Sequence, residues 1–222
     1  MSVSLRCYST SLGCPKNRVD TERLLGSLGV ALVPVESPDE AELVFINTCA
    51  FIQPATEESV RTIAQAIADI EELPKRPLLA VAGCLVGRYH AEDLAPELPE
   101  VDLWLDNSDL EAWPAMLARK LGLPEPTVPG RILSTGPSYA WLKISDGCRH
   151  ACSFCAIPNI RGGHRSHCKD MIVREARALL DQGVKELNLV AQDLTEWGCD
   201  LDGKQDLRTL LDGLLPLPGL ER

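Results

Sequence analysis

The feature that most constrains the fold is an alternation of short apolar runs and amphipathic stretches in the first half of the chain. The runs at 3–9, 42–47 and 78–83 are bounded by polar or turn residues, which is typical of strands buried on both faces of a parallel sheet. The stretches 17–29 and 54–73 between them carry apolar residues at helical spacing. This strand–helix alternation predicts an α/β domain.

The second half of the chain begins after a segment rich in proline and glycine, residues 123–137, which we interpret as a linker between domains 1–122 and 138–222. Beyond it, the pattern predicts a strand, a helix, a second strand and the start of a second helix. They cover residues 139–145, 169–183, 185–192 and 206–215. This βαβα order is the opening of a β/α barrel, but a full barrel needs about 250 residues. We therefore expect a truncated chain that is inactive by itself.

Composition and charge indicate the cellular compartment and the kinds of partner. The chain has a net charge of −10 and an odd number of cysteines, nine. The charge argues against passive binding to nucleic acid. The start of the chain lacks the apolar core of a signal peptide, and the longest apolar run is far below the ~20 residues that span a bilayer. We expect a cytoplasmic protein with reduced thiols and no membrane partner.

Three cysteines, Cys14, Cys49 and Cys84, are spaced 35 residues apart, and each follows the end of a predicted strand. The carboxyl ends of parallel strands lie on one edge of a sheet, where ligands bind, so these distant residues can meet in space. Helix N-termini that follow them would favour the thiolate. The alternative is that all three are small apolar fillers of the core.

Three further cysteines, Cys148, Cys152 and Cys155, form a C-x3-C-x2-C pattern directly after a predicted strand. One alternative is a zinc site completed by His150, His164 or His167. The pattern favours an iron–sulfur cluster instead, because no second C-x2-C pair accompanies it. Such clusters normally take four thiolates, so three would leave one iron open to a small molecule.

The chain resembles the radical S-adenosylmethionine (SAM) methylthiotransferases. The resemblance covers nearly the whole chain and lies in the segments SLGCPKNRVDTERLL, ELVFINTCAFIQPATEESV, VAGCLVGRY, LKISDGCRHACSFCAIPNIRG and GVKELNLVAQDLTEWG. It implies an N-terminal methylthiotransferase domain over 1–122 and the first units of a radical SAM barrel over 138–222.

The resemblance also implies cofactors and roles. Cys148, Cys152 and Cys155 would hold a 4Fe-4S cluster that cleaves SAM reductively, producing a radical that removes hydrogen from the target carbon. Cys14, Cys49 and Cys84 would hold a second 4Fe-4S cluster that carries the sulfur. An electron donor such as flavodoxin or ferredoxin would act as a partner. Gln192 and Asp193, at the end of a barrel strand, are candidates for contact with the cofactor.

Two branches of that family differ in substrate. The segments GCPKN, IPNIRG and AQDLTEWG resemble the branch that modifies the β-carbon of an aspartate in small-subunit ribosomal protein S-twelve. The other branch modifies an adenosine in transfer RNA, which we consider the less favoured substrate. A third reading, a non-catalytic iron–sulfur or zinc-binding fragment, stays open.

Several residues fit the pattern less well. His167 and Cys168 stand where the family usually has Arg-Pro. Cys7 lies within a predicted strand and is expected in the core, while Cys168 and Cys199 are interpreted as incidental thiols. A basic group at the edge of the second domain is either solvated charge or an attraction for anions. It comprises Lys143, Arg149, Arg161, Arg165 and Lys169.

Overall fold

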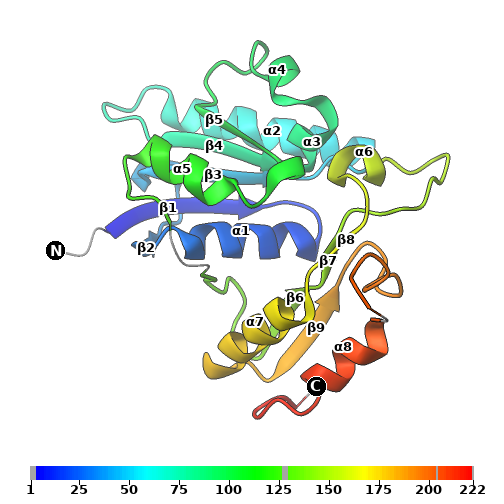
Figure 1. Cartoon of the computed structure of the whole chain (residues 1–222). Coiled ribbons are helices and arrows are strands. Elements are labelled where there is room, and N and C mark those ends of the chain that lie inside the picture. Colours follow the sequence, from blue (N-terminus) through cyan, green and yellow to red (C-terminus); the bar gives the residue numbers. More distant parts are fainter. Residues whose placement is uncertain (1–3, 127–129, 204, 222) are drawn as a thin grey trace. The chain divides into compact units, whose positions relative to one another are not determined.

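The computed structural model describes residues 4–126, 130–203 and 205–221, and the chain divides into two compact units between Ile132 and Leu133 (Figure 1). This division falls inside the segment 123–137 that we interpret as a linker. Part of that segment belongs to the first unit, because Arg131 forms an ion pair of 2.7 Å with Glu22, and both side chains are buried. The two units are described separately below.

The first unit is built on a five-stranded parallel sheet with the strand order β2-β1-β3-β4-β5. The three predicted strands are confirmed, whereas two four-residue edge strands were missed. Short edge strands lack a long apolar run, and most of the side chains in β2 are exposed, so the pattern gives little signal there. The strands are β1 (Ser4–Ser11), β2 (Ala31–Pro34), β3 (Leu43–Thr48), β4 (Leu78–Gly83) and β5 (Leu103–Asp106).

Helices connect these strands, and the two predicted helices are confirmed with shifted ends. Both begin with a proline in the first turn, where its missing N–H costs no hydrogen bond. The helices are α1 (Pro15–Ser27), α2 (Gln53–Ile70), α3 (Cys84–Tyr89), α4 (Ala91–Leu94) and α5 (Trp113–Leu121), with 3-10 turns η1 (Pro38–Glu40) and η2 (Asn107–Asp109).

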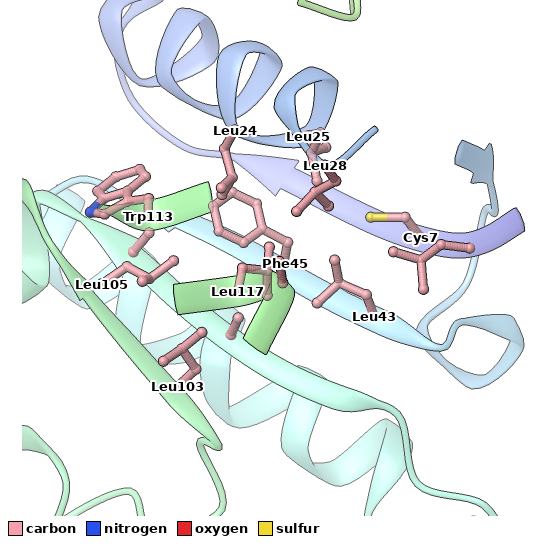
Figure 2. Close-up of a cluster of buried hydrophobic side chains, with 14 residues drawn as sticks. Cys7, Leu24, Leu25, Leu28, Leu43, Phe45, Leu103, Leu105, Trp113 and Leu117 are labelled. Carbon is pink, nitrogen blue, oxygen red and sulfur yellow. The ribbon is translucent and has the colours of Figure 1, made fainter. Parts of the chain in front are cut away.

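The core of this unit lies between the sheet and the helices α1 and α5 (Figure 2). Figure 2 shows Phe45 of β3 among leucines of α1 and the side chains of Trp113 and Leu117 on α5. Successive residues of β3 are all buried, so its other face is covered as well. Helix α2 contacts β3 and buries Ile63 and Ile70, which lie outside the first cluster. Two covered faces hold β3 and β4 rigidly, and these strands end at the candidate site.

The second unit contains the predicted βαβα order. Strand β6 (Tyr139–Lys143) pairs in parallel with β9 (Glu186–Val190), and α7 (Lys169–Asp181) connects them and packs its apolar face on β6. The predicted strand 139–145 is split, because its end forms a short antiparallel pair. The remaining elements are β7 (Ser145–Asp146), β8 (Arg165–Ser166), α6 (Ile157–Arg161) and α8 (Leu207–Leu214). Within the described residues, no helix is long and apolar enough to cross a membrane.

The packing of β3 generates a stability prediction. Replacing the fully buried Phe45 by Ala should lower the free energy of unfolding by about 3–5 kcal/mol, because the change removes apolar contacts and leaves a cavity. Replacing Phe51, whose side chain is half-exposed, by Ala is the matched control and should cost less than about 1 kcal/mol. Urea unfolding of both variants measures the difference, and equal losses would contradict the described core.

Candidate metal centres

The cysteines of the first trio lie at the carboxyl edge of three neighbouring strands. Ser11 of β1 is paired with Asn47 of β3, and Thr48 of β3 with Gly83 of β4, so the three strands end at about the same level. Cys14 is the N-cap of α1, Cys49 follows β3 directly, and Cys84 is the first residue of α3. Cys84 is buried and the other two are half-buried. The parallel register therefore brings the trio to one place, as the spacing predicts.

Residues on either side of Cys14 contact the other two cysteines. A Cβ on Gly13, in the β1–α1 loop, would lie 2.7 Å from the sulfur of Cys49, so this glycine packs directly against that side chain. The thiol of Cys84 donates to Oδ1 of Asn17, in the first turn of α1, over 3.8 Å. The chain around Cys14 is therefore in contact with both Cys49 and Cys84.

A buried polar layer holds this loop on the sheet. Nδ2 of Asn17 donates to the backbone oxygens of Leu12 and Thr48, at 3.0 and 2.8 Å. Nδ2 of Asn47 donates to the backbone oxygen of Asn17 at 2.9 Å. Because both asparagines are fully buried, these bonds are shielded from water and fix the end of β1 to β3. Sequence analysis missed the role of Asn47, although its place at the end of a strand is a signal.

A second asparagine adjoins the sulfur of Cys84. Nδ2 of Asn107, in the turn after β5, donates to this sulfur over 3.8 Å. Oδ1 of the same residue is buried without a hydrogen-bond partner among the described residues. Asn107 was not predicted from the sequence, because it follows an edge strand that the pattern did not reveal.

The second trio lies on the loop between β7 and α6. Cys148 and Cys155 are half-buried and Cys152 is exposed. The backbone N–H of Cys148 donates to the oxygen of Gly162, and that of Cys155 to the oxygen of Cys152. The first bond closes the loop at its base and the second closes a turn within it, and Cys152 is open to solutes.

Three of the six cysteines are preceded by a glycine in the left-handed region. Gly13, Gly83 and Gly147 have φ angles of 80°, 99° and 64°. At Gly83 a Cβ would lie 2.2 Å from Oδ1 of Asn47, and at Gly147 it would lie 2.1 Å from the oxygen of Gly163. Any side chain is therefore both strained and blocked at these positions. Each glycine turns the chain sharply out of the region of the preceding strand and so sets the direction of the cysteine that follows.

Buried charges support the base of the second loop. The carboxylate of Asp146 accepts from Lys143 at 3.0 Å, from Arg161 at 3.2 Å and from Nε2 of His167 at 3.1 Å. Burial would raise the pKa of Asp146, but the charges of Lys143 and Arg161 and the contact with His167 hold it well below its usual range. Lys143 and Arg161 are therefore neither solvated charge nor free to attract anions, and that interpretation was wrong for these two.

The contact with Asp146 also gives His167 a role. Its Nδ1 lies 3.1 Å from the backbone oxygen of Lys143, so the ring bridges two positions of the strand segment. The neighbouring Cys168 is exposed and is the N-cap of α7. Where the family pattern has Arg-Pro, this chain thus has a histidine that is part of the charge cluster.

The loop that carries Cys148, Cys152 and Cys155 contacts the segment that follows β9. Nε2 of His150 lies 3.2 Å from Oδ2 of Asp193, and the other carboxylate oxygen accepts from the N–H and hydroxyl of Thr195. The hydrogen bonds from Thr195 are the main reason why the pKa of Asp193 is lowered. Arg149 in the same loop is paired with Glu196. Gln192 and Asp193 therefore adjoin the cysteine loop, and their contact with a cofactor stays a prediction.

The donor sets fit clusters better than single ions. A tetrahedral ion with ligand distances of about 2.0–2.3 Å needs ligand atoms within about 4 Å of one another. In the described part of the chain, two groups of three residues place such atoms within 4.8 Å, and neither includes a cysteine of either trio. Sets made only of thiols suit an iron–sulfur group, whose ligands are cysteine thiolates. Cys7, by contrast, is in the core as predicted, and burial raises its pKa to about 12.

Comparison with known proteins finds relatives for both halves of the chain. Residues 6–106 match the family described as "Uncharacterized protein family UPF0004". The chain is 68% identical over 215 residues to the ribosomal protein uS12 methylthiotransferase RimO of Nitratidesulfovibrio vulgaris strain DP4. That alignment covers 97% of this chain and 50% of the relative. The chain is therefore similar to a RimO protein over nearly all of its own length. The RimO protein of Lawsonia intracellularis is 58% identical over all of this chain and 50% of its own length.

The chain thus spans about half the length of the curated RimO relatives that it matches. Among solved structures, the radical SAM methyltransferase TsrM from Kitasatospora setae matches 86% of this chain and 48% of its own, with a TM-score of 0.56. The sequence identity is 11%, so this likeness shows the fold alone. The predicted α/β fold is confirmed, and TsrM shares the arrangement of its strands and helices.

The contact between Gly13 and Cys49 can be tested by substitution. Gly13→Ala should displace the Cys49 thiol and lower iron uptake by the first trio, because the added methyl group would overlap the sulfur. Gly29→Ala is the matched control: Gly29 also has a left-handed φ, of 67°, but its Cβ would meet nothing within 4 Å. Both variants should lose about 1–2 kcal/mol of stability from backbone strain. Iron analysis after anaerobic reconstitution should then show a loss in Gly13→Ala only.

The charge cluster predicts how stability varies with pH. Because the folded-state pKa of Asp146 is lowered, its ionisation stabilises the fold above the unfolded pKa of about 3.9. This contribution is lost as the pH falls from about 4 through the folded pKa. In metal-free protein, Asp146→Asn should remove that pH dependence and cost about 3–5 kcal/mol at neutral pH, because buried charges lose their partner. Asp212→Asn, an exposed change on α8, is the control. Thermal unfolding from pH 7 to pH 3 measures both.

Proposed function

We propose that this chain serves a radical SAM iron–sulfur enzyme that adds a methylthio group to the β-carbon of an aspartate in ribosomal protein uS12. The observation that carries the proposal is the identity of 68% to a RimO protein across 97% of the chain. Under this proposal Cys148, Cys152 and Cys155 hold one 4Fe-4S cluster, and Cys14, Cys49 and Cys84 hold the other.

The residues of the chain supply the positions for this chemistry. When bound, a cluster with one open iron supplies the electron that cleaves SAM, and the second supplies a place for the sulfur. The hydrogen bonds of Asp146 with Lys143, Arg161 and His167 hold the base of the β7–α6 loop. The three thiols of that loop therefore keep their places during the reaction. Asn107 donates toward the sulfur of Cys84 and helps to hold it in position. Gln192 and Asp193, beside the loop, are proposed to contact the SAM.

Charge supports a protein substrate over RNA. Residues 1–137 carry 11 Lys or Arg and 20 Asp or Glu, a balance of −9, while residues 138–222 carry 11 and 12, a balance of −1. An acidic first unit repels the phosphates of RNA, since phosphate binding requires cationic side chains. It attracts a basic protein, as ribosomal proteins typically are, and speeds its approach. Such a substrate places the reaction in the cytoplasm, with a flavodoxin or ferredoxin as electron donor.

The two trios should fail differently when they are changed. We expect the reconstituted chain to bind about two four-iron clusters, and Cys152→Ala or Cys49→Ala to lower the iron content by about half each. Cys168→Ala, an exposed thiol outside both trios, is the control and should keep the full content. Iron and sulfide analysis with electron paramagnetic resonance gives the readout. Full iron loading in Cys49→Ala would refute a cluster held by Cys14, Cys49 and Cys84.

The substrate is tested with a longer protein, because the chain spans half the length of its relatives. A chimera joins these residues to the part of the N. vulgaris RimO that the alignment leaves uncovered. It is offered uS12 and transfer RNA together, with SAM, a sulfur source and a reductant. Mass spectrometry should find the methylthio group on the uS12 aspartate, and a gain on transfer RNA alone would overturn the assignment. The Cys152→Ala chimera should also lose SAM cleavage, whereas Cys49→Ala should keep cleavage and lose sulfur insertion.

A further inference from the structure

A third group of potential metal ligands lies in the second unit, apart from both cysteine trios. The ligand atoms of His164, Cys199 and Asp200 lie within 4.8 Å of one another. His164 precedes β8, and the other two residues lie in the turn after β9. The group therefore joins two segments that are distant in sequence. The imidazole of His164 is 2% exposed, whereas Cys199 and Asp200 are open to solvent. An ion could therefore reach the group from outside and bind a nitrogen that is shielded from water.

The distance between the ligand atoms of His164 and Asp200 fits a bound ion. Nε2 of His164 and Oδ1 of Asp200 are 3.5 Å apart, which is long for a hydrogen bond. Two ligands at about 2.1 Å from a tetrahedral ion lie about 3.4 Å apart. The hydroxyl of Ser166, 3.1 Å from the same nitrogen, holds the ring in place when no ion is bound.

Hydrogen bonds around the group hold its members in position. The N–H of Ser166 donates to Oδ2 of Asp200 at 2.9 Å, which leaves Oδ1 directed to His164. The N–H of Gly198 donates to Oγ of Ser166 at 2.9 Å, and the indole of Trp197 donates to the backbone oxygen of His167 at 3.0 Å. These three bonds join the β8 segment to the turn that carries Cys199 and Asp200. Such outer bonds orient metal ligands and raise the affinity of a site.

The ligand types select the kind of ion. An imidazole nitrogen, a thiolate and a carboxylate are the three side-chain ligands that Zn²⁺ takes, and Zn²⁺ accepts all of them in one tetrahedral site. Mg²⁺ and Ca²⁺ prefer oxygen ligands only. Three protein ligands leave the fourth position to water. The other tight group, His150, Asp193 and Glu196, has no sulfur and belongs to the cysteine loop already described.

We propose that His164, Cys199 and Asp200 form a Zn²⁺ site that joins the β8 segment to the turn after β9. The proposal does not depend on the proposed enzymatic function, because none of the three residues belongs to either trio. It revises the interpretation of Cys199 as an incidental thiol. An ion that binds the folded chain and not the unfolded chain also raises stability by mass action.

The test uses the chain with both trios first loaded with iron and sulfide, so that added metal meets the third group. Co²⁺ serves as the probe, because a cobalt–thiolate bond gives a charge-transfer absorption band, and Zn²⁺ should then displace it. We expect one equivalent of Co²⁺ with this band. Cys199→Ser should lose the band and weaken binding at least 10-fold. Asp200→Asn keeps the thiolate and should weaken binding at least 10-fold. Cys168→Ser, at another exposed thiol of the same unit, is the matched control and should bind like the unchanged chain.

His164→Ala is a further variant, but it removes a buried ring, so circular dichroism must show that it is folded. Cys199→Ser and Asp200→Asn change exposed side chains and keep the test decisive if His164→Ala fails to fold. Zn²⁺ should raise the unfolding temperature of the iron-loaded chain and of Cys168→Ser, but not of Cys199→Ser. The proposal is overturned if the iron-loaded chain binds no Co²⁺, or if Cys199→Ser keeps the cobalt–thiolate band.

Discussion

The parallel pairing of β1, β3 and β4 is the constraint on which the first site depends. Cys14, Cys49 and Cys84 are 35 residues apart in sequence, and only the common register of the three strands brings them to one edge. Both faces of β3 are buried, and a shift of one residue would move its apolar side chains to the wrong faces. The same packing that stabilises the sheet therefore sets the level at which Cys49 leaves it.

The two candidate centres are built in different ways. The first collects its thiols from three loops, so that its geometry depends on the whole sheet and on the buried amides of Asn17 and Asn47. The second collects them from one loop and depends on a local anchor, the charges around Asp146. Global loss of packing should thus impair the first centre, whereas loss of a single ion pair can impair the second. This difference follows from sequence spacing, because local ligands need local support.

Sequence analysis predicted the strands that bear cysteines and missed what surrounds them. The strands β3 and β4 are long apolar runs, and a run of this kind is visible in a single sequence. Asn107 could not be predicted as a neighbour of Cys84, because its place depends on β5, a four-residue edge strand. The burial of Lys143 and Arg161 was also hidden, since charged residues are normally exposed and only tertiary structure brings Asp146 between them. The group of His164, Cys199 and Asp200 was missed for the same reason.

The three glycines that precede Cys14, Cys84 and Cys148 have a consequence for evolutionary descent. A side chain at Gly83 or Gly147 would meet backbone oxygens within 2.6 Å, and one at Gly13 would meet the Cβ of Cys49, an atom that Ser or Ala also carries. Selection for folding alone would therefore retain these glycines in a lineage that had lost the chemistry, while the cysteines beside them would be free to drift. A glycine followed by Ser or Ala at these three places would be the trace of a centre that a descendant no longer uses.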